Sequence, residues 1–585
     1  MIRCFPTHRL TCAFRGVVMG SLLATVALAV PSTPHGGPTD VAPVSPAAPI
    51  DRAVASRLER AGVTPALCAD GVFVRRVHLD VIGTLPTAQE ARDFIQDPDT
   101  ANKRRQLIDR LLARPEYADY WAMKWSDILR IKAEFPVNLW PNAAQAYHRW
   151  VRAAIAANQP YDAFVRDLLT ASGSNFRVGP ANFYRAIQNR QPDGIAASVA
   201  LTFMGTRTET WPASRLDGMA AFFSQIGYKP TSEWKEEHVF WDPLGVASSP
   251  ANLAPGRAAI TAIGQPPAVP APGTPPAVVR PRPTVGVFPD GTPVTLPAER
   301  DPRDLFADWL ITPENPWFTR AIANRTWFWL LGRGVIHEPD DIRPDNPPAD
   351  PGVLAALESA LIGLRYDLRA FHRLILNSRT YQLTALTEKE TDRTAPLIGY
   401  RLRRLDAEVL IDAINAITGS SDLYTSPIPE PFTYIPEGQP AIAIADGSIT
   451  SPFLALFGRS ARATGQACER DHKPIPAQWL HLLNSSHIQR KLEQGPKLKA
   501  LFDSGRSPPR LIEELYLTIL SRLPTPAEMK IAEAYGQIQP VRQVAAKPGG
   551  PAPAAAVKTV VVKRREDWVD LAWSLINSTE FLYHH

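Results

Sequence analysis

Two groups of polar side chains in the second half of the chain have the types and spacing needed to bind a ligand. The first recurs at every third residue, which would place its members on one face of a helix: Gln478, His481 and Asn484. The second surrounds an aromatic segment and could hold an anion or a sugar: Asn324, Arg325 and Arg333. Each group also has a structural explanation, because polar stripes commonly make hydrogen bonds between helices and arginines commonly pair with nearby carboxylates.

Carboxylates gather in one segment that follows the second group. Asp340, Asp341 and Asp345, with Asn346, supply the oxygen ligands that Ca²⁺ prefers. The segment lacks the spacing of an EF-hand loop, and acidic residues between helices usually cap the next helix. We therefore expect no metal here, and we expect an arginine of the neighbouring group to pair with Asp340 or Asp341.

The chain lacks the common signatures of enzymes and cofactor sites. Its 12 histidines include no H-E-x-x-H, and there is no G-x-S-x-G, no P-loop and no G-x-G-x-x-G. No C-x-x-C-H occurs, although covalent haem needs two thiols and the adjoining histidine. The tryptophans at 309, 317, 327 and 329 have helical spacing, which favours the core over sugar stacking. We expect no cofactor and identify no catalytic residue.

The first 29 residues have the composition of a secretory signal peptide. Arg3, Arg9 and Arg15 accompany a short apolar run from Gly16 to Val30, and Ala27-Leu28-Ala29 fits a cleavage site. An uncleaved anchor helix is the alternative, but the run is short for a membrane span. We expect an extracytoplasmic protein, periplasmic or secreted, without a membrane span after cleavage.

Cleavage would change both the charge and the cysteine content of the chain. Three arginines and no acidic residue would be lost, so the formal net charge would fall from +5 to +2. Such a near-neutral chain gives no reason to expect nucleic-acid binding. Cys68 and Cys468 would be the only remaining thiols, and they could form one disulfide or be two buried apolar side chains.

The fold class predicted from periodicity and from breaks in composition is mainly α, with two helical domains joined by a proline-rich linker. Within the linker, Asp290-Gly291 predicts the turn of one small hairpin. The expected divisions are a signal peptide at 1–29, a Pro/Ala-rich tether at 30–50, helical domains at 51–243 and 301–585, the linker at 244–300, and a low-complexity loop near 541–557.

Helix-turn-helix units are reused along the chain. Residues 77–90 are similar to residues 515–528: in both, an apolar helix stops at Leu-Pro and a new helix starts at Thr. Each copy has the spacing of a capping box, in which the hydroxyl and the carboxylate bind backbone N–H groups: Thr87 with Glu90, and Thr525 with Glu528. These carboxylates are therefore predicted to cap helices.

Longer motifs resemble a family of exported planctomycete proteins. The first half is similar to the cytochrome C-associated domain (PSCyt type) through Arg75–Thr87, Leu111–Tyr117 and Trp121–Asp127. The second half is similar to the PSD-type domain that follows it in such proteins, through Asn315–Phe318, Ala323–Arg325, Gly332–Gly334, Phe457–Arg459, Cys468–Arg470 and His481–Asn484.

Many members of this family resemble haem proteins because a C-x-x-C-H loop joins two of their helices. Phe203–Arg207 and Gly218–Phe223 resemble the flanks of that loop. The residues between them are few and begin Thr208-Glu209-Thr210-Trp211. The resemblance therefore implies a derived member that kept the helical scaffold and lost the haem.

We consider three functions for such a chain. The first is a non-catalytic scaffold or binding component of the cell envelope, working beside other envelope proteins. The second is an extracytoplasmic enzyme acting on polysaccharide, which a pocket with convergent carboxylates would favour. The third is a role in electron transfer, which the missing haem motif disfavours.

Overall fold

The computed structural model describes residues 49–60, 62, 66–244, 283–385, 399–541 and 558–585. The predicted signal peptide, most of the predicted tether and linker, and the loop at 542–557 lie outside the described residues. All described residues belong to a single unit, Pro46–His585. The unit is mainly α-helical, as predicted.

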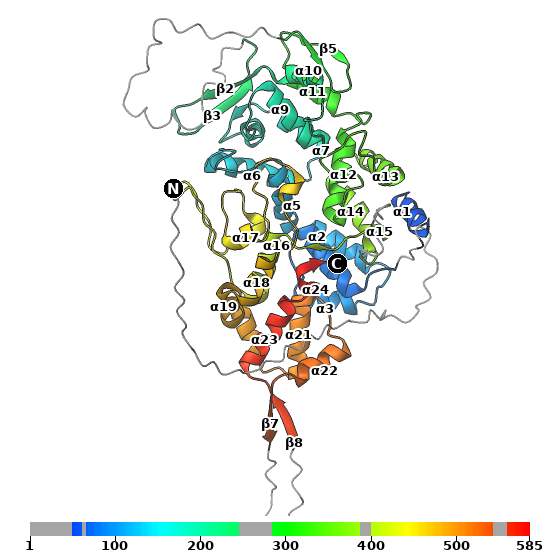
Figure 1. The fold of residues 1–585 in the computed structure, drawn as a ribbon, viewed down its shortest axis with the longest axis vertical. Coiled ribbons are helices and arrows are strands. Elements are labelled where there is room, and N and C mark those ends of the chain that lie inside the picture. The colour runs from blue at the N-terminus through cyan, green and yellow to red at the C-terminus, as the bar shows by residue number, and fades with distance from the viewer. Residues whose placement is uncertain (1–48, 61, 63–65, 245–282, 386–398, 542–557) are drawn as a thin grey trace, which may run out of the picture. The chain divides into compact units, whose positions relative to one another are not determined.

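The first half is built from short helices (Figure 1). They are α1 (Pro49–Arg60), α2 (Asp70–Ile82), α3 (Ala88–Gln96), α4 (Lys103–Leu112), α5 (Glu116–Ile128), α6 (Pro141–Ala156), α7 (Tyr161–Thr170), η1 (Gly179–Ala181), α8 (Asn182–Arg185), α9 (Pro192–Val199), η2 (Ala200–Met204), α10 (Ala213–Ala220) and η3 (Ala221–Phe223).

The second half is also helical, and its first helix begins as predicted, with the Asp301 side chain accepting from the N–H of Arg303. The elements are α11 (Pro302–Leu310), α12 (Phe318–Leu331), α13 (Pro351–Gly363), α14 (Leu368–Asn377), α15 (Arg379–Gln382), α16 (Ala407–Thr418), η5 (Ala441–Ala443), α17 (Pro452–Leu456), η6 (Ala467–Glu469), α18 (Pro476–Asn484), α19 (Ser486–Gln494), α20 (Pro496–Phe502), α21 (Pro508–Leu520), α22 (Pro526–Ala534), α23 (Arg565–Ile576) and α24 (Thr579–Leu582).

The strands are short and antiparallel. One sheet has the order β1-β3-β2, from β1 (Gly173–Ser174), β2 (Ile226–Pro230) and β3 (Glu237–Trp241). The predicted hairpin is present, because β4 (Val285–Val287) pairs with β5 (Pro293–Thr295) around Gly291, whose φ is 94°. The remaining pairs are β6 (Arg403–Arg404) with β9 (Tyr583–His584), and β7 (Gln537–Val541) with β8 (Lys558–Val562).

The two helix-turn-helix copies have the same local chemistry. Both capping boxes form, at the start of α3 and at the start of α22. The preceding helices, α2 and α21, both end at a residue in the left-handed region: Gly83 with φ 64° and Ser521 with φ 60°. A β-carbon on Gly83 would meet the Tyr120 ring at 2.4 Å, so glycine is required at this close approach. The predicted reuse of one unit is therefore confirmed.

Buried polar groups of α2 hold it against residues from the second half of the chain. The guanidinium of Arg75 donates to the carbonyl oxygens of Ile519 (2.9 Å) and Phe581 (2.7 Å). Asp80 is fully buried and accepts from Arg403 Nη2 at 2.6 Å. Figure 1 accordingly shows α2 beside α24. The two halves of the chain thus share one buried polar core as well as an apolar one.

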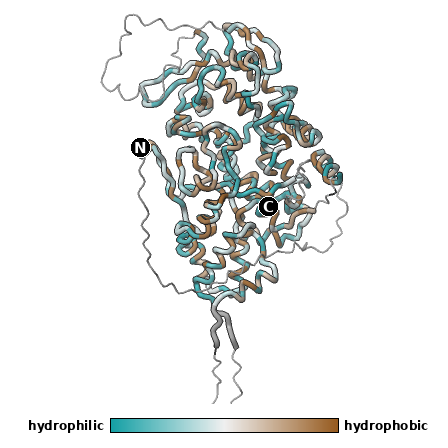
Figure 2. The backbone as a smooth tube through the Cα atoms, viewed as in Figure 1, coloured by the Kyte–Doolittle hydropathy of each residue, from teal (hydrophilic) through white to brown (hydrophobic). Residues whose placement is uncertain are grey.

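Hydrophobic residues recur along most helices (Figure 2), and the buried ones form a continuous apolar cluster that includes residues of both halves. Amphipathic helices of this kind gain stability from burying one face against their neighbours. Within the part of the chain that the structure describes, no helix has the length and apolar character needed to cross a membrane.

Candidate functional site

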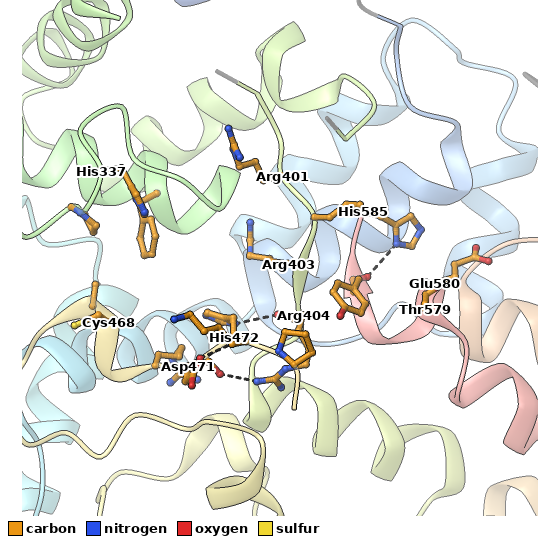
Figure 3. Close-up of a pocket in the computed structure, with 18 of the residues that line it drawn as sticks. His337, Arg401, Arg403, Arg404, Cys468, Asp471, His472, Thr579, Glu580 and His585 are labelled. Carbon is orange, nitrogen blue, oxygen red and sulfur yellow. Dashed lines mark hydrogen bonds between the residues drawn. The ribbon is translucent and has the colours of Figure 1, made fainter. Parts of the chain in front are cut away.

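A cleft of about 1180 Å³ opens between segments of the second half that are distant in sequence. It is bounded by β6 and the residues before it, by the loop after α12, by the segment after η6, and by the last residues of the chain (Figure 3). Among the described residues of the first half, only Val72 of α2 lines it. The antiparallel pairing of β6 with β9 brings residues 401–404 next to residues 579–585.

Cations outnumber acids around this cleft. Its six basic side chains are Arg401, Arg403, Arg404, Arg470, Lys473 and Arg522, and its three acidic ones are Glu338, Asp471 and Glu580. Histidines and aromatic rings complete the lining, including His337, His472, His585, Phe328, Trp479 and Tyr583. Apolar walls with a few charged groups are the usual composition of a ligand-binding pocket.

The acids of the cleft already have partners. Glu580 accepts from Arg522 Nε at 2.6 Å, and Glu338 lies 3.6 Å from Arg207. Asp471 turns its Oδ1 towards its own loop and accepts the backbone N–H of Lys473 at 2.8 Å. The cleft therefore does not present a pair of uncommitted carboxylates.

Two of the cations have no carboxylate partner among the described residues. Arg404 donates only to backbone carbonyls, those of Leu405, Phe457 and Asp471, at 2.7–3.1 Å. Burial lowers the pKa of Arg404 below its usual value, and the charges of Asp406 and Asp471, which raise it, offset the loss of water only in part. Lys473 is exposed at the rim and forms no ion pair with a described side chain. The cleft thus carries positive charge that its own acids do not neutralise.

A buried ion network lies behind the wall formed by Arg470. This guanidinium contacts Asp127 at 2.7 Å, Glu408 at 2.6 Å and Asp406 at 3.5 Å. Lys124 also pairs with Asp406, at 2.5 Å. Burial alone would raise the pKa of Glu408, but the charges of the surrounding arginines, Arg470 first, lower it to about 2. The network therefore holds Glu408 and Asp406 ionised and fixes Arg470 in place.

His472 stands between this network and the cleft. Its Nδ1 lies 3.2 Å from the carbonyl oxygen of Arg404, and its Nε2 lies 3.5 Å from Asp406. Burial lowers the pKa of His472 to about 4, so the ring is neutral at pH 7. A neutral ring whose Nδ1–H donates to the carbonyl stabilises the wall next to Arg404.

The second sequence-predicted group, Asn324, Arg325 and Arg333, is mainly structural. Arg325 and Asp340 are both fully buried and pair at 2.9 Å, which is the structural explanation considered for this arginine. Asn324 exchanges two 2.9 Å hydrogen bonds with the backbone of Ile336. Arg333 is half-buried near Arg401. Burial is the main cause that lowers the pKa of Arg401, and the charge of Arg333 lowers it further. Of this group, only Arg333 adds to the positive field beside the cleft.

The first sequence-predicted group, Gln478, His481 and Asn484, is divided between different roles. Gln478 is buried, donates to the carbonyl of Leu456 at 3.0 Å and accepts from the N–H of Ile475. His481 instead contacts His487 in a separate pocket. Asn484 is exposed at the end of α18. The three residues therefore do not form one site, although they share one helix.

The acidic segment pairs with arginine. Asp341 and Asp345 both contact Arg343, at 3.1 Å and 3.3 Å, while Asp340 pairs with Arg325. Across the described ranges, no three His, Cys, Asp or Glu side chains have an arrangement suited to a metal ion. These carboxylates therefore balance arginine charges.

Cys68 and Cys468 are not bonded to one another in the structure. Cys68 is buried, and its backbone pairs with Gln382. Cys468 is exposed at the mouth of the cleft, on η6. The structure therefore contains no bond between these two thiols, and only Cys68 has the burial expected of a buried apolar thiol.

The segment that the sequence resemblance compares with a haem loop is a short connection from η2 to α10. Gly205 ends η2 with φ 59°, and its carbonyl accepts the N–H of Ile342 at 2.9 Å. Trp211 is half-buried, with the Arg215 guanidinium 4.1 Å from its ring centroid. Pro212 precedes the first residue of α10. Thr208, Glu209 and Thr210 lie within this connection.

Sequence reasoning missed the cleft itself. The run Arg401-Leu402-Arg403-Arg404 is a basic cluster that could have been noticed. The contact of this run with the end of the chain could not have been noticed, because it depends on the β6–β9 pairing. The approach of the segment that holds Lys473 depends on another long-range contact, in which Arg404 donates to the carbonyl of Asp471.

Comparison with protein families agrees with the resemblance drawn from the sequence. Residues 49–211 match PSCyt2, and residues 302–536 match PSD1; each is described as a protein of unknown function, DUF1549 and DUF1553 respectively. No curated protein and no solved structure gives a match. The chain belongs to the proteins in which a PSCyt2 domain is followed by a PSD1 domain.

Proposed function

We propose that the protein is an exported binding component that holds an anionic ligand in the cationic cleft. The observation that carries this proposal is the charge of the cleft, where Arg404 and Lys473 have no carboxylate partner among the described residues. An anion bound there would supply the missing negative charge, and charge-assisted hydrogen bonds to guanidinium groups are among the strongest available. The aromatic rings of Trp479 and Tyr583 would contact the rest of the ligand.

Binding fits this cleft better than hydrolysis of a polysaccharide. Most glycoside hydrolases need two carboxyl groups that flank the scissile bond. Glu580 and Glu338 are instead engaged by Arg522 and Arg207. Anion binding also requires no haem, which agrees with a sequence that has no C-x-x-C-H.

Export is part of the proposal and rests on the first 29 residues, whose composition is that of a signal peptide. An exported protein of this kind would meet its ligand in the cell envelope, beside other envelope proteins. Recovery of the protein from the cytoplasm of its native host with Met1 intact would contradict this part.

Replacement Lys473→Glu should weaken binding of dextran sulfate by about tenfold. The change removes an uncompensated cation from the rim and puts a carboxylate where the sulfate groups would lie. Isothermal titration calorimetry with the purified protein at fixed ionic strength measures the effect.

Two controls make this experiment specific. Lys530→Glu makes the same charge change on an exposed residue of α22 that does not line the cleft. Unmodified dextran has the same sugar backbone without sulfate. Equal losses for the two variants, or equal binding of sulfated and unmodified dextran, would contradict a cationic binding cleft.

A further inference from the structure

A second pocket, of about 540 Å³, lies away from the cationic cleft. It is bounded by the residues after α16, by the start of α17, and by facing parts of α18 and α19. Two histidines and one carboxylate line it: His481, His487 and Asp422. The proposed binding function uses none of them.

These three side chains form a continuous hydrogen-bonded chain. His487 Nε2 lies 2.8 Å from Asp422 Oδ1, and His487 Nδ1 lies 3.4 Å from His481 Nε2. A carboxylate accepts, so this bond places a proton on His487 Nε2, and in the singly protonated ring Nδ1 is the acceptor. His481 then donates its Nε2–H to His487, which leaves the lone pair on His481 Nδ1 available as a base.

The ring geometry favours proton sharing over metal binding. The two imidazole centroids are 5.6 Å apart while the facing nitrogens are 3.4 Å apart, so the nitrogens point almost directly at each other. Metal ligands would instead converge on a point to one side of the line that joins them.

The surroundings fix this chain in place. Lys491 lies 3.4 Å from Asp422 Oδ1 and donates to Asn415 Oδ1 at 2.7 Å. Phe453 contacts both imidazoles edge-on, with centroids 5.7 Å from His481 and 6.0 Å from His487. Burial lowers the pKa of His481 and outweighs the charge of Asp422, which raises it, so the ring is unprotonated at neutral pH.

We propose that this pocket is a second chemical site, in which His481 is the general base of ester hydrolysis and the Asp422–His487 pair orients it. His481 Nδ1 takes a proton from water, and the hydroxide formed adds to the ester carbonyl carbon. The tetrahedral intermediate expels the alkoxide, which takes the proton back from His481, so that acid and alcohol are released and the base is restored. While His481 is charged, its Nε2–H bond to His487, backed by Asp422, stabilises the cation.

The probe for this activity is p-nitrophenyl acetate, hydrolysed by the purified full chain. His481→Phe keeps an aromatic ring against Phe453 and should reduce kcat/KM about 100-fold. Asp422→Asn keeps the side-chain shape and should lower kcat about tenfold with KM little changed, because it acts only through His487. His238→Phe, an exposed position on β3, is the matched control and should be neutral.

A second measurement uses the unaltered protein, so its result does not depend on whether a variant folds. Diethyl pyrocarbonate acylates unprotonated imidazole, and mass spectrometry resolves each modified histidine. His481 of the unaltered protein should react faster than exposed His238. Hydrolysis that survives His481→Phe, or a His481 that reacts no faster than His238, would overturn the proposal. Neither result bears on anion binding in the cationic cleft, so the two proposals fail separately.

Discussion

Replacing Arg470 by methionine should lower the free energy of unfolding by about 3–5 kcal/mol. The guanidinium lies within 2.7 Å of both Asp127 and Glu408, and its side chain is 8% exposed. Methionine retains most of the apolar stem but leaves these carboxylates with fewer cations in a site from which water is excluded. Arg462 and Arg459 still contact Asp127 and Glu408, which limits the loss.

Urea unfolding followed by circular dichroism measures this loss. The matched control is Arg105→Met on the exposed face of α4, where the guanidinium donates only to Asn102 on the same surface. That variant should change the stability by less than about 0.5 kcal/mol. If both variants unfolded at the same urea concentration, the buried network would not stabilise the fold as inferred.

Acid should destabilise the protein through Glu408, and Glu408→Gln should remove that part of the pH dependence. Arg470 and Arg459 lower the pKa of Glu408 in the folded state to about 2, from 4.5 in an unfolded chain. A folded pKa below the unfolded one favours the ionised form, so this contribution is complete above pH 4.5 and is lost as the pH falls towards 2. The shift corresponds to about 3 kcal/mol for this fully buried carboxylate.

The comparison of variants isolates this carboxylate from other acid-sensitive groups. Burial lowers the pKa of His148 and His372 to about 3, so both rings are neutral in the folded protein. Because the unfolded chain can protonate these rings near pH 6.5, the protein loses stability as the pH falls below that value. That loss should occur equally in the parent and in Glu408→Gln. At pH 7 the free energy of unfolding of the variant should be lower than that of the parent, and the gap between the two values should narrow below pH 4.5. If the two free energies of unfolding instead changed in parallel down to pH 2, the assignment to Glu408 would be wrong.

Local features were predictable because short-range chemistry decides them. The capping boxes at Thr87 and Thr525 depend on residues three apart, and both form. The Asp290-Gly291 turn and the start of α11 after Asp301 depend on neighbours in the chain and are also present. Even the pairing of Arg325 with Asp340 joins the middle of α12 to the loop that follows this helix.

The sites depended on contacts that no local pattern encodes. Lys124 and Asp406 are 282 residues apart, and Asp422 meets His487 across 65 residues. The positive cleft exists because β6 pairs with β9 and brings Arg404 close to the end of the chain. The sequence alone therefore determined the helices, their caps and the family. The tertiary structure decided which charges are neutralised, because burial and long-range pairing depend on how the helices pack together.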